Sequence, residues 1–176
     1  MTVSPALATP AWRYWMPFPP GVVVPLGQIP PDFALWDVTY QRTVRLANWR
    51  GKQPVVLFFC RLPVAETYRA ERWPYLVAIN RAYAQFRNAG AEVLMVANTS
   101  RRQGQAMVDD LGLTVPVLSD DTGAVFRAYR TGQAWGAPLP AQFVLDAQGR
   151  LRARHLFSLL HHQAAVESLL TLVDGL

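Results

Sequence analysis

The stretch Pro54-Val55-Val56-Leu57-Phe58-Phe59-Cys60 is followed by a more polar segment, residues 61–71 (RLPVAETYRAE). An uninterrupted apolar run of this length predicts a strand that is buried on both faces. After it we expect a loop and then the first turn of a helix, over Ala65 to Glu71. The single cysteine of the chain, Cys60, lies at the end of the predicted strand, so the predicted helix start contains no thiol.

The composition predicts one folded domain without a nucleic-acid partner. The chain has 176 residues, of which 51% are hydrophobic, and this suits a single core. The net charge is +5, carried by arginines scattered from Arg13 to Arg154. Because the arginines form no basic run and no recognition motif, we interpret them as a solvated surface.

The residue composition argues against a disulfide, a metal site, a cofactor site and a membrane span. One cysteine excludes an intrachain disulfide and a cysteine metal cage. The three histidines, His155, His161 and His162, lack the spacing of a chelating pair, and no cofactor fingerprint is present, so we predict neither metal nor cofactor. No apolar run is long enough to span a membrane, and residues 1–10 do not resemble a secretory signal, so we predict a cytoplasmic protein.

Residues 1–26 differ from the rest of the chain. They interleave six prolines with aromatic side chains, which excludes a long helix or a central strand. Exposing so many aromatic rings to water is unfavourable. We therefore predict an arm that packs either on its own domain or on a second subunit of a homodimer, and a domain over residues 27–176.

Strand and helix patterns alternate along residues 27–176. The predicted order is β-β-α-β-α-β-α-β-β-α, which indicates a layered α/β domain with a mixed sheet. The predicted strands and hairpins are 38–46, 55–59, 92–97, 114–118, 142–145 and 150–157. The predicted helices are 67–88, 101–111, 124–130 and a last one carrying Val166, Leu169, Leu170 and Val173. Pro74 should kink the first of these helices or mark its real start.

Five segments then resemble, in order, the motifs of one family. They are residues 27–35 (GQIPPDFAL), 46–59 (LANWRGKQPVVLFF), 89–100 (AGAEVLMVANTS), 117–120 (VLSD) and 143–149 (FVLDAQG). Together they resemble the peroxiredoxin or AhpC/TSA family (alkyl hydroperoxide reductase, thiol-specific antioxidant) of the thioredoxin-like superfamily. The resemblance implies a thioredoxin-like fold, with a central mixed sheet flanked by helices.

The chain departs from the family at the catalytic positions. The resemblance places Ala65 and Tyr68 where related proteins carry active-site thiols, with Tyr68 at the peroxidatic cysteine. The family's chemistry requires a thiolate stabilised at a helix N-terminus. A phenol with a pKa of about 10 does not replace it at neutral pH, and an alanine does not replace it at all.

The segment before the strand at 142–145 also departs from the family. Peroxiredoxins often carry an arginine there, whereas this chain has Pro140, which resembles the cis-proline loop of thioredoxin-like reductases. We therefore predict a cis peptide bond at Pro140. Around it we expect a groove that can bind a peptide or a small molecule. Its predicted lining residues are Arg61, Glu66, Tyr68, Trp73 and Pro140.

Two functions stay open from the sequence. In the first, the protein is redox-inactive at the usual site and acts as a binding module through this groove. In the second, it is a single-cysteine thiol peroxidase or thiol-disulfide oxidoreductase that uses Cys60, with Arg61 lowering the thiol pKa. Because free cysteines are among the most buried residue types, we favour a structural role for Cys60.

Overall fold

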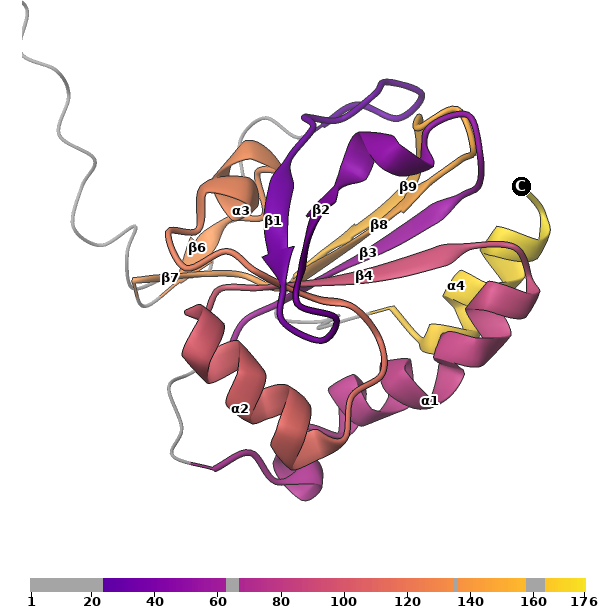
Figure 1. Ribbon diagram of the computed structural model, residues 1–176. Helices are drawn as coiled ribbons and strands as arrows, with labels where there is room; N and C mark the ends of the chain where they lie inside the picture. Colours follow the sequence, from indigo (N-terminus) through magenta and orange to yellow (C-terminus); the bar gives the residue numbers. More distant parts are fainter. Residues whose placement is uncertain (1–23, 63–66, 135, 158–163) are drawn as a thin grey trace, which may run out of the picture.

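The centre of the molecule is a seven-stranded mixed sheet with the order β2-β1-β5-β4-β3-β8-β9 (Figure 1). The computed structural model describes residues 24–62, 67–134, 136–157 and 164–176. The strands of this sheet are β1 (Ala34–Asp37), β2 (Arg42–Arg45), β3 (Val55–Cys60), β4 (Glu92–Ala97), β5 (Val117–Ser119), β8 (Ala141–Leu145) and β9 (Leu151–Leu156). The α-helices are α1 (Pro74–Asn88), α2 (Arg101–Leu111), α3 (Ala124–Ala128) and α4 (Val166–Asp174). This is the predicted thioredoxin-like α/β architecture.

Strand β3 is the central element, as its apolar sequence predicts. It pairs in parallel with β4, from Val55 opposite Glu92 to Cys60 opposite Ala97, and antiparallel with β8 on its other side. All six of its residues are buried. A strand with neighbours on both sides and helices on both faces exposes no side chain to water, which is why its sequence does not alternate.

The two faces of the sheet carry different helices. Side chains of a strand alternate between faces, so Val56, Phe58 and Cys60 join the core cluster that includes residues of α1, α2 and α4. The other residues of β3 join the second cluster, which includes residues of α3. Figure 1 shows α1, α2 and α4 on one side of the sheet and α3 on the other. Cys60 therefore points toward the α1 layer.

The first helix is shorter than the pattern over 67–88 predicts. A 3-10 turn covers Ala70–Arg72, and α1 begins only at Pro74. Proline suits the first position of a helix because its fixed φ is helical and no hydrogen-bond partner is needed for its nitrogen. Of the two alternatives left open for Pro74, the structure shows the helix start. Leu76, Ile79, Tyr83 and Phe86, spaced three or four residues apart, form the buried face of this helix.

Three local features refine the predicted elements. Helix α2 begins with a capping box in which Ser100 and Gln103 exchange hydrogen bonds, as expected for a polar cap before residue 101. The first hairpin pairs β1 with β2, so its second strand lies within the predicted range 38–46 and its first strand lies before it. A small separate hairpin, β6 (Gln133–Ala134) with β7 (Ala137–Pro138), was not predicted.

The N-terminal arm lies outside the described residues up to position 23. From residue 24 onward the chain runs beside the edge strand β9. The Gly27 amide donates to the Leu151 carbonyl at 2.7 Å, and the Leu151 amide donates to the Gln28 carbonyl at 2.8 Å. Within the described ranges, no helix is long and apolar enough to cross a membrane. Nor do those ranges bring together three or more histidine, cysteine or acidic side chains that could hold a metal ion.

Candidate functional site

The end of β3 and the start of β8 define the candidate site. Phe59 lies opposite Ala141 in the antiparallel register, so Cys60 and Pro140 occupy the same end of two adjacent strands. The loop after β3 is also held on the side of β4, because the Leu62 amide donates to Asn98 Oδ1 at 2.8 Å. Asn98 directly follows β4, so the parallel pairing of β3 and β4 places it within reach of this loop.

A cavity of about 120 Å³ lies at this end of the sheet. We call it the Trp73 groove. It is bordered by Cys60, Arg61, Leu62, Arg72, Trp73, Pro74, Tyr75, Leu76 and Pro140. Three of the predicted groove residues, Arg61, Trp73 and Pro140, thus lie around one cavity. Its use as a binding site stays a prediction.

Several walls of this groove were not predicted from the sequence. Leu62, Tyr75 and Leu76 contribute apolar surface, and the exposed Arg72 adds a second cation to the half-buried Arg61. The signal in the sequence that could have predicted these walls was Pro74, because it marks the start of α1. A helix that begins at residue 74 brings its first turn, and the residue before it, to the end of β3.

The remaining predicted site residues lie elsewhere. Tyr68 is 2% exposed and does not border the groove; its ring packs beside Trp73 with centroids 6.1 Å apart. Ala65 and Glu66 lie outside the described residues. In the described part of the predicted helix start, Thr67 to Glu71, there is no α-helix. Tyr68 therefore does not lie at the positive end of a helix, and the predicted helix start over this segment was wrong.

The predicted cis peptide bond at Pro140 was also wrong. Every peptide bond in the described part of the chain is trans, including the one before Pro140. The trans form is the default even for proline, since the cis form occurs in only about 5–6% of such bonds in folded proteins. Pro140 still borders the groove, with a trans backbone leading directly into β8.

Cys60 has the environment of a core residue. It is 3% exposed, and its Sγ donates to the Phe58 carbonyl oxygen at 3.7 Å. Burial raises the pKa of the Cys60 thiol to about 12. Although Cys60 borders the groove beside Arg61, its thiol stays protonated at neutral pH, and a protonated thiol is a poor nucleophile.

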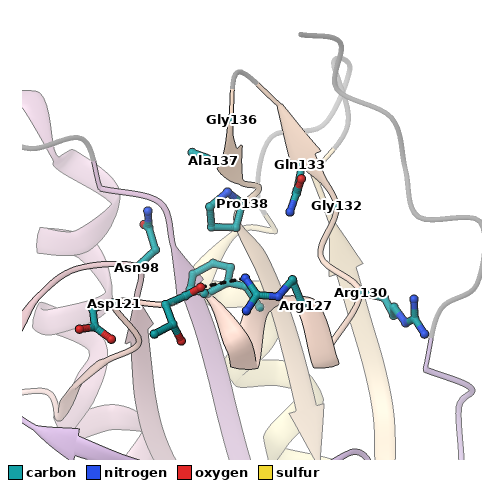
Figure 2. Close-up of a pocket in the computed structure, with 12 residues that line it drawn as sticks. Asn98, Asp121, Arg127, Arg130, Gly132, Gln133, Gly136, Ala137 and Pro138 are labelled. Carbon is teal, nitrogen blue, oxygen red and sulfur yellow. Dashed lines mark hydrogen bonds between the residues drawn. The ribbon is translucent and has the colours of Figure 1, made fainter. Parts of the chain in front are cut away.

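A second and larger cavity, of about 440 Å³, lies around Arg127 (Figure 2). We call it the Arg127 cavity. It lies between the ends of β4 and β5, helix α3 and the β6–β7 hairpin. No motif in the sequence pointed to it, because its walls combine Asn98 with several short pieces of the segment 121–138.

The fold and the sequence agree on the class of the protein. It is a thioredoxin-like α/β protein, and among solved structures it resembles the reduced 2-Cys peroxiredoxin of Plasmodium vivax (TM-score 0.70, 21% identity, covering 85% of this chain and 80% of that one). It also resembles AhpC of Enterococcus faecalis (TM-score 0.70, 20% identity, covering 85% of this chain and 90% of that one). At these identities the likeness establishes the fold.

The sequence comparisons establish the family. The AhpC/TSA family profile matches residues 26–154. Peroxiredoxin Q, chloroplastic, of Triticum aestivum is 31% identical over 131 residues, which are 70% of this chain and 55% of that protein. The protein of the same name from Sedum lineare is 31% identical over 131 residues, which are 70% of this chain and 64% of that protein. The chain therefore belongs to the AhpC/TSA family of peroxiredoxins, and it spans little more than half the length of these relatives.

Proposed function

We propose that this protein is a redox-inactive peroxiredoxin homologue that binds a peptide in the Trp73 groove. The observation that carries the proposal is the burial of Cys60, the single thiol of the chain. A peroxidase of this family has to present a thiolate to peroxide, and Cys60 presents a protonated thiol that points toward the α1 layer.

The groove has the size and chemistry for one peptide side chain. Its volume of about 120 Å³ lies below the roughly 300–1,000 Å³ of small-molecule pockets. Its walls combine apolar groups, Leu62, Trp73 and Leu76, with the arginines Arg61 and Arg72. An apolar side chain followed by an acidic one matches this arrangement, because the apolar group fills the cavity and the carboxylate lies by the arginines.

An array of acetylated tetrapeptides, varied at both central positions, tests this proposal. We expect the bound peptides to be enriched in an apolar residue next to Asp or Glu. Trp73→Ala should weaken their binding about tenfold, as for an aromatic residue at the centre of an interface. The matched control is Trp36→Ala, which removes a tryptophan that lies under Arg101, outside the groove. Binding that is absent, or equally weakened in both variants, would contradict the proposal.

The second candidate function is a thiol peroxidase or oxidoreductase that uses Cys60. One observation favours it: Cys60 borders the groove next to Arg61, so a small opening of the wall would bring peroxide to the thiol. Peroxide turnover that Cys60→Ser abolishes would establish this candidate. Turnover that survives in Cys60→Ser would exclude it.

A homodimer formed through residues 1–26 is a further part of the proposal. Leu26 and Ile29 flank the two residues that pair with β9, and they are 58% and 44% exposed. Exposed apolar side chains of this size are stabilised when another protein surface covers them. Light scattering should show a dimer for the full chain and a monomer after deletion of residues 1–25; the same mass for both would contradict this. A cytoplasmic location is likewise a proposal, which cell fractionation tests.

A further inference from the structure

The Arg127 cavity lies where the connections after two adjacent parallel strands leave the sheet in opposite directions. Strand β4 leads into α2, which packs in one core cluster, and β5 leads into α3, which packs in the other. Asn98 follows β4 and Asp121 lies just after β5, and both border the cavity. In open α/β sheets, ligands bind in the crevice at such a point, outside the carboxyl ends of the strands.

Two arginines, Arg127 and Arg130, border this cavity, and the Arg127 guanidinium is held in place by a hydrogen bond. The Arg127 Nη1 donates to the Thr122 carbonyl oxygen at 2.8 Å, which fixes the guanidinium across the space below the hairpin. Figure 2 shows it below Pro138 and Gln133 of the hairpin, with Asn98 to one side. A guanidinium has five N–H donors, so a single backbone bond leaves most of them for a ligand.

Asn98 adds a hydrogen-bond donor to this cavity. The Asn98 Oδ1 is already occupied by the Leu62 amide, so Asn98 offers its NH₂ group. The first amides of α3 are not available, because Asp120 accepts from Ala124, Val125 and Phe126 at 2.9–3.2 Å. The anion-binding groups are therefore side chains, and the helix terminus is already satisfied.

The hairpin β6–β7 supplies an apolar wall. Its two-residue strands do not join the main sheet, and Ala137 and Pro138 border the cavity. Gly132 and Gly136 flank the strands with φ of 89° and 69°, a backbone conformation that glycine adopts without strain. The cavity thus has an apolar side opposite its donors, with a volume inside the usual range for small ligands, roughly 300–1,000 Å³.

We propose that the Arg127 cavity is a binding site for a small organic monocarboxylate. The carboxylate pairs with the Arg127 guanidinium and accepts from Asn98, while the apolar body of the ligand lies against Ala137 and Pro138. Asp121 at the rim disfavours a second negative charge, which selects a monoanion over a phosphate or a dicarboxylate. This site is separate from the Trp73 groove and does not depend on the function proposed for it.

The experiment titrates the protein with 4-fluorophenylacetate and, separately, with its neutral amide. We expect the ¹⁹F signal of the acid to broaden and shift, and the backbone amide signals of Asn98, Gly132 and Gly136 to move. The neutral amide should bind at least about tenfold more weakly, because it lacks the charge that pairs with Arg127. This comparison uses the unaltered protein, so it does not depend on the folding of any variant.

Two arginine variants then locate the carboxylate. Arg127→Gln should weaken binding of the acid about tenfold or more. Arg87→Gln is the control, because the Arg87 guanidinium lies over the Tyr83 ring and does not border the cavity. The proposal is overturned if the acid perturbs none of the three amides, if acid and amide bind equally, or if Arg87→Gln weakens binding as much as Arg127→Gln. Perturbation confined to residues of the Trp73 groove would also overturn it.

Discussion

The backbone amide of Tyr68 donates a 2.7 Å hydrogen bond to Oδ2 of Asp110, near the end of α2. The two residues are 42 positions apart. The bond holds the segment after β3 against α2, and the Tyr68 ring is buried within the core cluster of that face. The position at which the family resemblance places a peroxidatic thiol is therefore a packing position in this protein.

The Tyr68–Asp110 bond should contribute measurably to stability. Asp110→Ala should lower the free energy of unfolding by about 1–2 kcal/mol, as for a hydrogen bond to a charged group. Asp109→Ala is the control, because Asp109 is a neighbouring exposed residue whose Oδ1 accepts from Gln105, within the same helix, at 2.9 Å. Urea unfolding measures both variants. Equal values for the two would contradict the anchoring role of Asp110.

The Cys60 thiol should be nearly unreactive in the folded protein. A pKa of about 12, against about 8.5 for a free cysteine, reduces the thiolate fraction at pH 8 by roughly three orders of magnitude. Burial slows the reaction further. We expect labelling by a disulfide reagent to be slow in buffer and fast in urea. Equal rates in the two conditions would show that the thiol is exposed.

Asp37 should give stability an unusual pH dependence. It is fully buried at the end of β1, and burial raises its pKa above 3.8, despite hydrogen bonds from Tyr40 and Thr39 and the charge of Arg42. The folded state thus binds the proton more tightly than the unfolded chain does. The stability of the wild type relative to Asp37→Asn should therefore rise as the pH falls through the raised pKa, and level off below 3.8.

Asp32 is a control, because the stability that it contributes depends on pH in the opposite direction. Burial opposes the shift, but hydrogen bonds from Arg45 and Ala47 lower its pKa overall. The stability that Asp32 contributes is present above pH 3.8 and is lost as the pH falls through the lowered pKa. Urea titrations of both variants across this range test the two signs. Parallel curves for Asp37→Asn and Asp32→Asn would contradict this description.

Ala164, just before α4, is held by two side chains near the groove. Its amide donates to Gln142 Oε1 at 3.1 Å, and its carbonyl accepts from the Tyr75 hydroxyl at 3.0 Å. Tyr75→Phe and Gln142→Leu should each cost about 1 kcal/mol. Because both bonds hold the same residue, the double variant should lose less free energy of unfolding than the two single variants together. We expect the difference to be about 0.5 kcal/mol or more.

A second double variant checks this coupling. The Tyr40 hydroxyl donates to the Thr114 carbonyl at 2.6 Å, and neither residue contacts Ala164 through a hydrogen bond. Tyr40→Phe combined with Gln142→Leu should therefore be additive in urea unfolding. Additivity in both pairs would show that Tyr75 and Gln142 act independently on α4.

The fold was predictable where local patterns decide the structure. The apolar runs at 55–59 and 93–97 predict strands, because a strand at the centre of a sheet buries its side chains on both faces. The spacing of Leu76, Ile79, Tyr83 and Phe86 fixed one face of α1. Pro74 left two alternatives, since a proline either starts or kinks a helix, and tertiary packing selects between them.

The candidate sites were less predictable because they join distant segments. Leu62 and Asn98 are 36 positions apart, and only the parallel register of β3 and β4 brings them into contact. The strands β6 and β7 have two residues each, too few for any alternation to show in the sequence. The first hairpin was misplaced because its turn includes Gln41, a non-glycine residue with a φ of 52° that no turn motif announces.

The most direct test of the proposed loss of redox activity is peroxide consumption with a dithiol reductant, measured for the wild type and for Cys60→Ser. We predict that both consume hydrogen peroxide at the rate of the reductant alone, and that mass spectrometry finds Cys60 unoxidised in the folded protein. Saturable peroxide consumption by the wild type that Cys60→Ser abolishes would contradict the account, because it would show that the buried thiol is the nucleophile of a working peroxidase.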